Sequence, residues 1–227
     1  MPVLLLIRHG ENDLVGKRLA GRMPGVHLND RGRQQAERVA LALEHAPIRA
    51  VYSSPLERAV ETAAPLARLL GQEVQVRQGL IEIDFGAWQG FTGKQMRRAR
   101  LWKAVQSTPS QVVFPQGESF AAAQARMAAE VNAIAASHDE KDLVAIFSHA
   151  DSIRLTVAHF LGLPLDNFQR LSIDTASITV LMLGKEGAMF GPINMSVHYS
   201  LRVDLAPIFA PPPPAKPEVK NTDAKST

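Results

Sequence analysis

Apolar residues occur along this 227-residue chain in short continuous runs that are separated by longer amphipathic stretches. Residues 3–7 and 143–147 carry only apolar side chains, which is the pattern of parallel strands buried on both faces of a sheet. A shorter run at residues 50–52 predicts another strand, and residues 177–183 predict the last strand of the sheet. The pattern therefore indicates one sheet built from several buried strands.

Between these runs, apolar side chains recur at helical spacing. The first such stretch predicts a helix over about residues 31–45, with an apolar face at Ala36, Val39, Ala40 and Leu43. Further on, Ser54-Pro55-Leu56-Glu57 predicts a helix start in which Ser54 is the capping residue. Two more helices are expected over residues 118–138 and from residue 148 to about residue 161. Strands that alternate with helices predict an α/β fold, a three-layer sandwich whose mainly parallel central sheet is flanked by helices.

The end of the chain differs in composition from the rest. Residues 210–227 begin with a proline-rich stretch and contain no aromatic residue, which favours an extended polyproline conformation without a packed core. Residues 1–209 contain no internal repeat and no linker. We therefore expect one folded domain over residues 1–209, followed by a Pro-rich disordered tail over residues 210–227.

Composition narrows the possible chemistry and the possible partners. The chain has no cysteine, which excludes disulfides, thiolate nucleophiles and cysteine-bound metal centres. Its formal net charge is only +3 and it has no block of basic residues, so nucleic-acid binding is not expected. The apolar run at residues 3–7 is too short for a signal peptide, and no run is long enough to span a membrane. We expect a cytoplasmic protein with no membrane partner, and its oligomeric state is left open.

Two of the predicted strands end in the same way. Residues 3–7 run into Arg8-His9-Gly10, and residues 143–147 run into Ser148-His149-Ala150. In open α/β sheets, ligands bind at the carboxyl ends of the parallel strands. The small residue after each histidine leaves room for a ligand beside the backbone. This pattern predicts that His9 and His149 converge on one binding site.

Two arginines indicate the charge of the ligand. Arg58 lies in the first turn of its predicted helix, where the helix dipole disfavours a cation unless an anion is bound there. Arg8 ends a buried strand, where a charge is costly unless a negative group meets it. A guanidinium group matches phosphate oxygens in bidentate geometry. Together with His9 and His149, these arginines predict a phosphate site.

Several motifs then occur in a recognisable order from residue 8 to residue 154. They are Arg8-His9-Gly10-Glu11, Gly32 with Gln35-Ala36, Ser53-Ser54-Pro55-Leu56-Glu57-Arg58-Ala59 with Thr62, Glu82 with Gly86, Trp88 and Gly90, Pro115-Gln116-Gly117-Glu118-Ser119, and Ser148-His149-Ala150. In this order they resemble the successive motifs of the histidine phosphatase superfamily. The resemblance implies the phosphoglycerate mutase-like fold over most of the chain.

The resemblance also implies how the site residues act. His9 is the implied nucleophile, which attacks phosphorus and becomes a phosphohistidine. The implied phosphate-binding residues are Arg8, Arg58 and His149. Positive side chains suit this role, because phosphoryl transfer depends on positioning and on charge stabilisation at the phosphate oxygens.

Glu82 is implied as the proton donor to the leaving alcohol and then as the base that activates water. Both tasks require a raised pKa, which burial among Ile81, Ile83 and Phe85 would produce. The resemblance thus implies a phosphomonoester hydrolase that acts on a small acidic phosphorylated metabolite and needs neither a metal nor another cofactor.

The chain departs from the family pattern near the implied phosphate pocket. Asn12 stands where the family usually has Thr or Ser, and Val15 stands where an Asn is expected. Residues 18–28 resemble the substrate loop of the family but carry Pro24-Gly25 where an Asp is common. Asn12 is a candidate replacement for the Asn that is missing at position 15.

The sequence also bears on other functions. A P-loop is excluded because five residues rather than four separate Gly10 from Gly16-Lys17. A metal site at His9, His149 and Asp151 is disfavoured because the neighbouring arginines would repel a cation. Two alternatives stay open, a phosphoglycerate mutase-type transferase and a non-catalytic module that binds a phosphorylated ligand. The stretch between residues 91 and 116 is short for a mutase, and its basic residues favour an acidic phosphomonoester; they are Arg97, Arg98, Arg100 and Lys103.

Overall fold

The computed structural model describes residues 1–184 and 187–197. Within these residues, six strands form one sheet; they are β1 (Val3–Arg8), β2 (Ile48–Ser53), β3 (Val74–Val76), β4 (Leu143–Ser148), β5 (Ile178–Gly184) and β6 (Gly187–Phe190). The predicted tail over residues 210–227 lies outside the described residues.

The strands follow the order β3-β2-β4-β1-β5-β6 across the sheet. The four strands from β3 to β1 are parallel, whereas β5 pairs antiparallel with β1, and β6 pairs antiparallel with β5. The mainly parallel sheet predicted from the sequence is confirmed. The prediction that residues 177–183 close the sheet is wrong, because β6 adds another strand at that edge.

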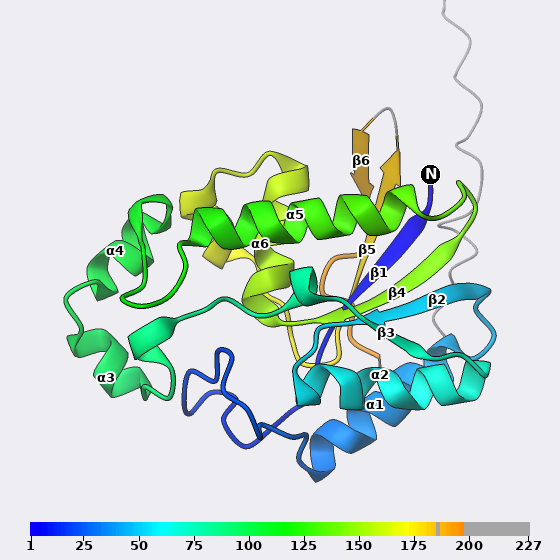
Figure 1. The fold of residues 1–227 in the computed structure, drawn as a ribbon, viewed down its shortest axis with the longest axis horizontal. Coiled ribbons are helices and arrows are strands. Elements are labelled where there is room, and N and C mark those ends of the chain that lie inside the picture. The colour runs from blue at the N-terminus through cyan, green and yellow to red at the C-terminus, as the bar shows by residue number, and fades with distance from the viewer. Residues whose placement is uncertain (185–186, 198–227) are drawn as a thin grey trace, which may run out of the picture.

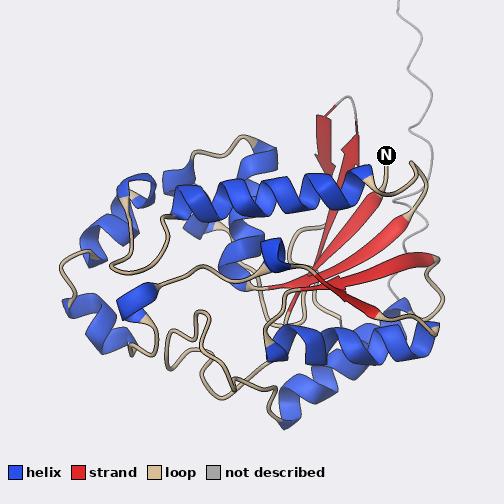
Figure 2. Ribbon diagram, viewed as in Figure 1, coloured by secondary structure: helices blue, strands red, loops and turns tan. Residues whose placement is uncertain are grey.

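Helices cover both faces of the sheet (Figures 1 and 2). The α-helices are α1 (Asp30–Leu43), α2 (Glu57–Leu70), α3 (Gly93–Arg98), α4 (Trp102–Ser107), α5 (Phe120–Ala136) and α6 (Ala150–Leu161). Single turns of 3₁₀ helix are η1 (Gln78–Leu80), η2 (Gly86–Trp88) and η3 (Pro109–Gln111), and a longer one is η4 (Leu165–Arg170). None of the helices in the described part of the chain is long and apolar enough to cross a membrane.

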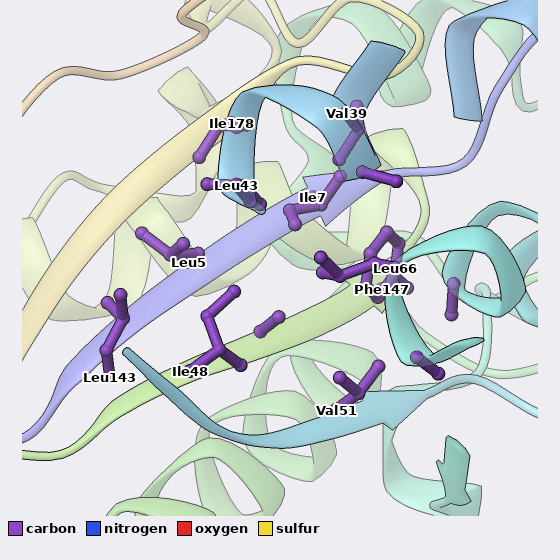
Figure 3. Close-up of a cluster of buried hydrophobic side chains, with 14 of the residues drawn as sticks. Leu5, Ile7, Val39, Leu43, Ile48, Val51, Leu66, Leu143, Phe147 and Ile178 are labelled. Carbon is purple, nitrogen blue, oxygen red and sulfur yellow. The ribbon is translucent and has the colours of Figure 1, made fainter. Parts of the chain in front are cut away.

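Alternate side chains of the central strand β1 pack against the two helical layers. Leu5 and Ile7 belong to one buried cluster with Val39 and Leu43 of α1 and Leu66 of α2, which is drawn in Figure 3. Leu4 and Leu6 point to the opposite face, where they pack with apolar residues of α5 and α6. A strand buried on both faces has to be apolar at every position, which is why residues 3–7 read as a continuous run.

A third apolar cluster lies beside the sheet and supports the segment that carries Glu82. It is built largely from aromatic side chains of residues 85–120, and neighbouring rings pack edge to face with centroids 5.0–5.4 Å apart. The cluster also contains Leu155 of α6 and Phe168 of η4. Residues 81–119 are therefore anchored to the body of the protein rather than free at its surface.

The start of α2 differs from the sequence prediction. The helix begins at Glu57, and its N-cap, Leu56, makes no side-chain capping bond. The hydroxyl of Ser54 accepts a hydrogen bond from the backbone N–H of Leu56 at 3.3 Å and also contacts His149. The prediction that Ser54 caps the helix is wrong, since the N-cap is Leu56 and the hydroxyl of Ser54 is hydrogen-bonded to His149. Arg58 nevertheless lies in the first turn of α2, as predicted.

Candidate active site

The two predicted histidines lie side by side at the carboxyl edge of the sheet. β1 and β4 run parallel with Arg8 opposite Ser148, so His9 and His149 leave the sheet at the same level. The centroids of their rings are 5.2 Å apart, and the backbone N–H of His9 donates to the carbonyl of Ser148 at 2.9 Å. Both side chains are buried. The convergence predicted from the two strand ends is confirmed.

Hydrogen bonding leaves one nitrogen of His9 free to react. Nδ1 lies 2.7 Å from the carbonyl oxygen of Gly10, which can only accept, so Nδ1 carries the hydrogen and Nε2 keeps a lone pair. Burial, and then the positive charges of Arg58 and Arg8, lower the pKa of His9 well below its usual value. The imidazole is therefore neutral at physiological pH, as a nitrogen nucleophile has to be.

The turn that holds His9 requires a glycine. The backbone N–H of Gly10 donates to Oγ1 of Thr62 at 2.9 Å, and Oγ1 in turn donates to the carbonyl of Arg58. A Cβ at position 10 would lie 2.6 Å from the carbonyl oxygen of Gly32, closer than real contacts allow. The peptide that orients His9 is thus bonded directly to α2, which also carries Arg58.

Arg58 is buried and Arg8 is half-buried, and each holds N–H groups that are buried and unpaired. Nη2 of Arg58 donates to the carbonyl of Gly21 at 2.7 Å, and Nη1 of Arg8 donates to the carbonyl of Ile173 at the same distance. The Nε and Nη1 groups of Arg58 and the Nε group of Arg8 are buried without a hydrogen-bond partner. Burial lowers the pKa of both guanidinium groups. Buried donors are rarely left unpaired in proteins, so this arrangement favours a bound anion.

His149 offers a further donor to the same space. Its Nε2 lies 2.7 Å from Oγ of Ser54, while its Nδ1 is buried without a partner. The Ser54 hydroxyl can donate its hydrogen to a ring nitrogen that keeps a lone pair, so we assign the hydroxyl hydrogen to the bond with Nε2 and the imidazole hydrogen to Nδ1. Burial lowers the pKa of His149 well below its usual value, and the nearby Arg58 lowers it further. A neutral His149 can therefore donate through Nδ1.

Glu82 is the buried carboxyl group of the site. It lies between η1 and η2 and is only 8 % exposed. Its Oε1 lies 2.9 Å from the backbone N–H of Ile83 and 3.0 Å from the hydroxyl of Ser152 in α6. Burial raises the pKa of Glu82, and the nearby carboxylate of Asp151 raises it further, against the opposite effects of the Ile83 N–H, Arg58 and Ser152. The environment thus raises the pKa of Glu82 above its usual value, as the sequence predicted.

These groups face a small cavity of about 150 Å³. Four of the five predicted site residues line it, Arg8, His9, Arg58 and Glu82, and the fifth, His149, packs against His9. The remaining wall comes from residues that the sequence did not identify as part of the site or only suggested; they are Asn12, Val15, Gly16, Arg18, Leu19, Ala20, Gly21, Phe85, Ala150 and Asp151. The five residues, drawn from four separate segments, form a single site.

Several details of the site could not be read from sequence spacing. Asn12 lines the cavity while its Oδ1 accepts the N–H of Leu14. The basic residues of α3, α4 and the turn between them do not line it: Arg97, Arg98, Arg100 and Lys103. Ser152 and Asp151 belong to the first turn of α6, and only the approach of this helix to residues 81–82 gives them a role. Within the described residues, no group of three or more His, Asp or Glu side chains is arranged to hold a metal ion.

Comparison with known proteins gives consistent matches over most of the chain. A sequence model of the histidine phosphatase superfamily (branch 1) matches residues 4–194. Phosphoserine phosphatase 1 of Hydrogenobacter thermophilus is 29% identical over 206 residues, which cover 87% of this chain and 94% of that protein. A 2,3-bisphosphoglycerate-dependent phosphoglycerate mutase of Thermoplasma acidophilum is 30% identical over 182 residues, 80% of this chain and 87% of that protein.

Solved structures give the same picture. A mycobacterial glucosyl-3-phosphoglycerate phosphatase superposes with a TM-score of 0.77 at 30% identity, covering 86% of this chain and 99% of that chain. Proteins named as phosphatases and a protein named as a mutase are therefore all similar to this chain.

Proposed function

The chain belongs to the histidine phosphatase superfamily, and we propose that it hydrolyses a small acidic phosphomonoester through a phosphohistidine on His9. The family and the relatives named as phosphatases support phosphatase activity in general terms. The finer proposal rests on one observation, which is a set of buried, unpaired donors around a neutral histidine. They are Nε and Nη1 of Arg58, Nε of Arg8 and Nδ1 of His149.

In the first step, the lone pair of His9 Nε2 attacks phosphorus and the bond from phosphorus to the ester oxygen breaks. Glu82 gives its proton to the departing oxygen, so the alcohol leaves neutral and Glu82 becomes a carboxylate. The bond from Nδ1–H of His9 to the carbonyl of Gly10 keeps the ring oriented while positive charge develops on it. Splitting hydrolysis into two displacements gives each step a good nucleophile.

In the second step, the Glu82 carboxylate takes a proton from water as the water oxygen attacks phosphorus. The bond between phosphorus and Nε2 breaks, inorganic phosphate leaves, and His9 and Glu82 return to their starting states. Throughout, Arg8, Arg58 and His149 donate hydrogen bonds to the non-bridging oxygens. These donors cost stability in the free protein, because each is buried without a partner.

We propose that this chemistry needs neither a metal nor another cofactor. Two guanidinium groups already supply positive charge at the position where a phosphate would lie, and burial strengthens their effect. The carboxyl groups of the cavity are Glu82, which is needed as an acid, and Asp151, which is paired with Arg154 at 2.9 Å.

The size of the cavity supports a small substrate. Its volume of about 150 Å³ is below the roughly 300–1,000 Å³ of pockets that hold drug-sized ligands. Arg18 lies on its wall and offers a third positive group, besides Arg8 and Arg58, for an acidic leaving group. The positive charge that favours an acidic substrate thus comes from Arg18 in the loop after β1 rather than from the basic residues of α3 and α4.

Mutase-type transfer is the second candidate, because a relative bears that name. A mutase must return the phosphoryl group to a second oxygen of a bound intermediate, which needs room to reorient it. The small cavity and the short segment over residues 91–116 favour hydrolysis instead. A module that only binds a phosphorylated ligand is disfavoured, since anion binding requires no buried carboxyl group beside the anion.

One experiment tests the proposal. Phosphate release is measured from a panel of small phosphomonoesters with EDTA present, for wild type and His9→Ala side by side. Release by wild type alone is expected. Exchange between phosphoglycerate isomers without net phosphate release would move the function to a mutase. No activity in either assay would support a module that only binds a phosphorylated ligand. Phosphate release that EDTA abolishes would overturn the proposal that no metal is needed.

A further inference from the structure

Arg22 joins two parts of the active site that are far apart in the sequence. It lies in the loop between β1 and α1, directly after Gly21, whose carbonyl oxygen accepts the bond from Nη2 of Arg58 at 2.7 Å. The guanidinium of Arg22 bonds to a different segment, because its Nε donates to the carbonyl oxygen of Glu82 at 2.8 Å. Two adjacent residues of one loop thus contact a proposed phosphate-binding residue and the backbone of the proposed acid.

The same guanidinium is held by a carboxylate that also binds the acid segment. Nη2 of Arg22 donates to Oε1 of Glu118 at 2.8 Å, and the backbone N–H of Asp84 donates to the same oxygen at 2.9 Å. Nη1 of Arg22 lies 3.5 Å from Oδ2 of Asp84. Arg22 and Glu118 therefore contact the two residues that flank Ile83, one through a carbonyl and the other through an N–H.

A second arginine holds the segment from its other end. Arg126 of α5 donates from Nη1 to the carbonyls of Gly79 and Ile81, both at 2.8 Å, and from Nη2 to Oε1 of Glu118 at 2.7 Å. Consecutive carbonyls, those of Ile81 and Glu82, are thus each bonded to an arginine, and both arginines share the carboxylate of Glu118. The backbone of Glu82 is fixed by charged side chains rather than by strand or helix hydrogen bonds.

We propose that Arg22 is a positioning residue that sets the location of the Glu82 carboxyl group relative to the phosphate held by Arg58. The role needs an arginine, because one planar guanidinium bonds to Glu82 and Glu118 at once, and a lysine ammonium does not offer this fork. Arg22 itself does not line the cavity, so it acts through Glu82 and not through contact with substrate. Proton donation depends steeply on such placement, since a displacement of about 1 Å can cost about 10²-fold in rate.

The kinetic test compares two reactions that differ in their need for an acid. In Arg22→Met, kcat for alkyl phosphates is expected to fall about 10²-fold with little change in KM. The pre-steady-state burst of nitrophenolate from p-nitrophenyl phosphate is expected to stay within about threefold of wild type, since this leaving group needs little protonation. Arg22→Lys should resemble Arg22→Met. The matched control is Arg68→Met, which removes an exposed ion pair with Glu37 between α2 and α1, outside the cavity, and should change neither reaction.

Several results would overturn the proposal. Equal losses in both reactions would assign Arg22 a role in folding. A change confined to KM would assign it a role in substrate binding. Full activity of Arg22→Lys would show that only its positive charge matters. Glu118→Gln gives a second variant should Arg22→Met fold poorly, and the same selective loss is expected from it.

The kinetic test rests on the proposed function, so a structural readout accompanies it. Hydrogen exchange of the backbone amides in residues 79–85 is expected to be faster in Arg22→Met than in wild type or Arg68→Met. Unchanged exchange would overturn the anchoring role even in a protein without phosphatase activity. An inactive wild type with faster exchange in Arg22→Met would overturn the proposed function and leave the anchoring role supported.

Discussion

Replacing Arg58 by methionine should make the free protein more stable while it removes the response to phosphate. Arg58 is only 1 % exposed, and its Nε and Nη1 groups have no hydrogen-bond partner. Leaving a buried donor unsatisfied costs about 1–3 kcal/mol, so these two groups destabilise the free protein by about 2–6 kcal/mol. Methionine has a similar length, carries no charge and adapts to irregular space.

The substitution also removes a favourable bond. Nη2 of Arg58 donates to the carbonyl of Gly21 at 2.7 Å, and a hydrogen bond from a charged group contributes about 1.5–3 kcal/mol. Attraction to Glu82 and Glu57 favours the charged arginine as well, but burial is the larger effect and lowers its pKa. The midpoints of these two ranges, about 4 and about 2 kcal/mol, leave a gain of about 2 kcal/mol for Arg58→Met, which corresponds to roughly 4–8 °C in Tm for a domain of this size.

Phosphate should reverse the order of stability of wild type and Arg58→Met. A ligand present at 100 times its Kd stabilises the folded state by about 2.7 kcal/mol. Wild type should show such a shift with inorganic phosphate, and Arg58→Met should show little or none. The assay is thermal and urea unfolding with and without phosphate, with Arg68→Met as the control whose exposed pair with Glu37 changes stability by less than about 0.5 kcal/mol.

Either of two results would contradict this prediction for Arg58→Met. A variant that is clearly less stable than wild type in phosphate-free buffer would show that the guanidinium is satisfied without an anion. A phosphate shift in Arg58→Met equal to that of wild type would show that the anion binds elsewhere.

Four further predictions concern the reacting groups. His9→Ala should lose turnover entirely while its circular dichroism spectrum stays that of the wild type; residual phosphate release would contradict the phosphohistidine mechanism. Glu82→Gln should lower the steady-state turnover of alkyl phosphates by about 10²–10⁴-fold but leave the stopped-flow burst of nitrophenolate from p-nitrophenyl phosphate unchanged. Equal losses of the turnover and of the burst would argue against an acid role. The pH profile of kcat/KM for alkyl phosphates should keep its activity to well below pH 6.5, where His9 finally protonates, and should fall as pH rises through the raised pKa of Glu82. Because the folded state holds the Glu82 proton more tightly than the unfolded state, wild-type stability should decline as pH rises from about 4.5 through that pKa; Glu82→Gln should remove this decline in urea titrations at several pH values.

Local sequence was sufficient for the layers of the fold and for the two histidines. Residues 3–7 and 143–147 had to be strands buried on both faces, and β1 and β4 are adjacent and parallel. Parallel strands end at the same edge of a sheet, so a histidine placed after each strand was enough to predict that the two rings meet. The family resemblance supplied the expectation for Glu82, which lies in no regular strand or helix.

Predictions from the local sequence were wrong where the tertiary structure offered a side chain or a strand a different partner. Ser54 has the right spacing for a helix cap, but its hydroxyl accepts the N–H of Leu56 and bonds to His149, which is distant in the sequence. Residues 177–183 read as the last strand, since the exposed edge strand β6 has too weak a pattern to predict. The basic residues around residue 100 looked suited to an acidic substrate, yet the cavity is lined by Arg18 from another loop.

The sequence by itself determined which residues are apolar enough to form the sheet, which polar residues interrupt that pattern, and that the chemistry had to proceed without cysteine. Only the tertiary structure decided how far each charge is buried and which N–H groups are left without partners. It also brought Arg22, Glu118 and Arg126 around the backbone of Glu82. The physical reason is that periodicity is a property of neighbouring residues, whereas desolvation and hydrogen-bond pairing depend on segments that meet only after the chain has folded.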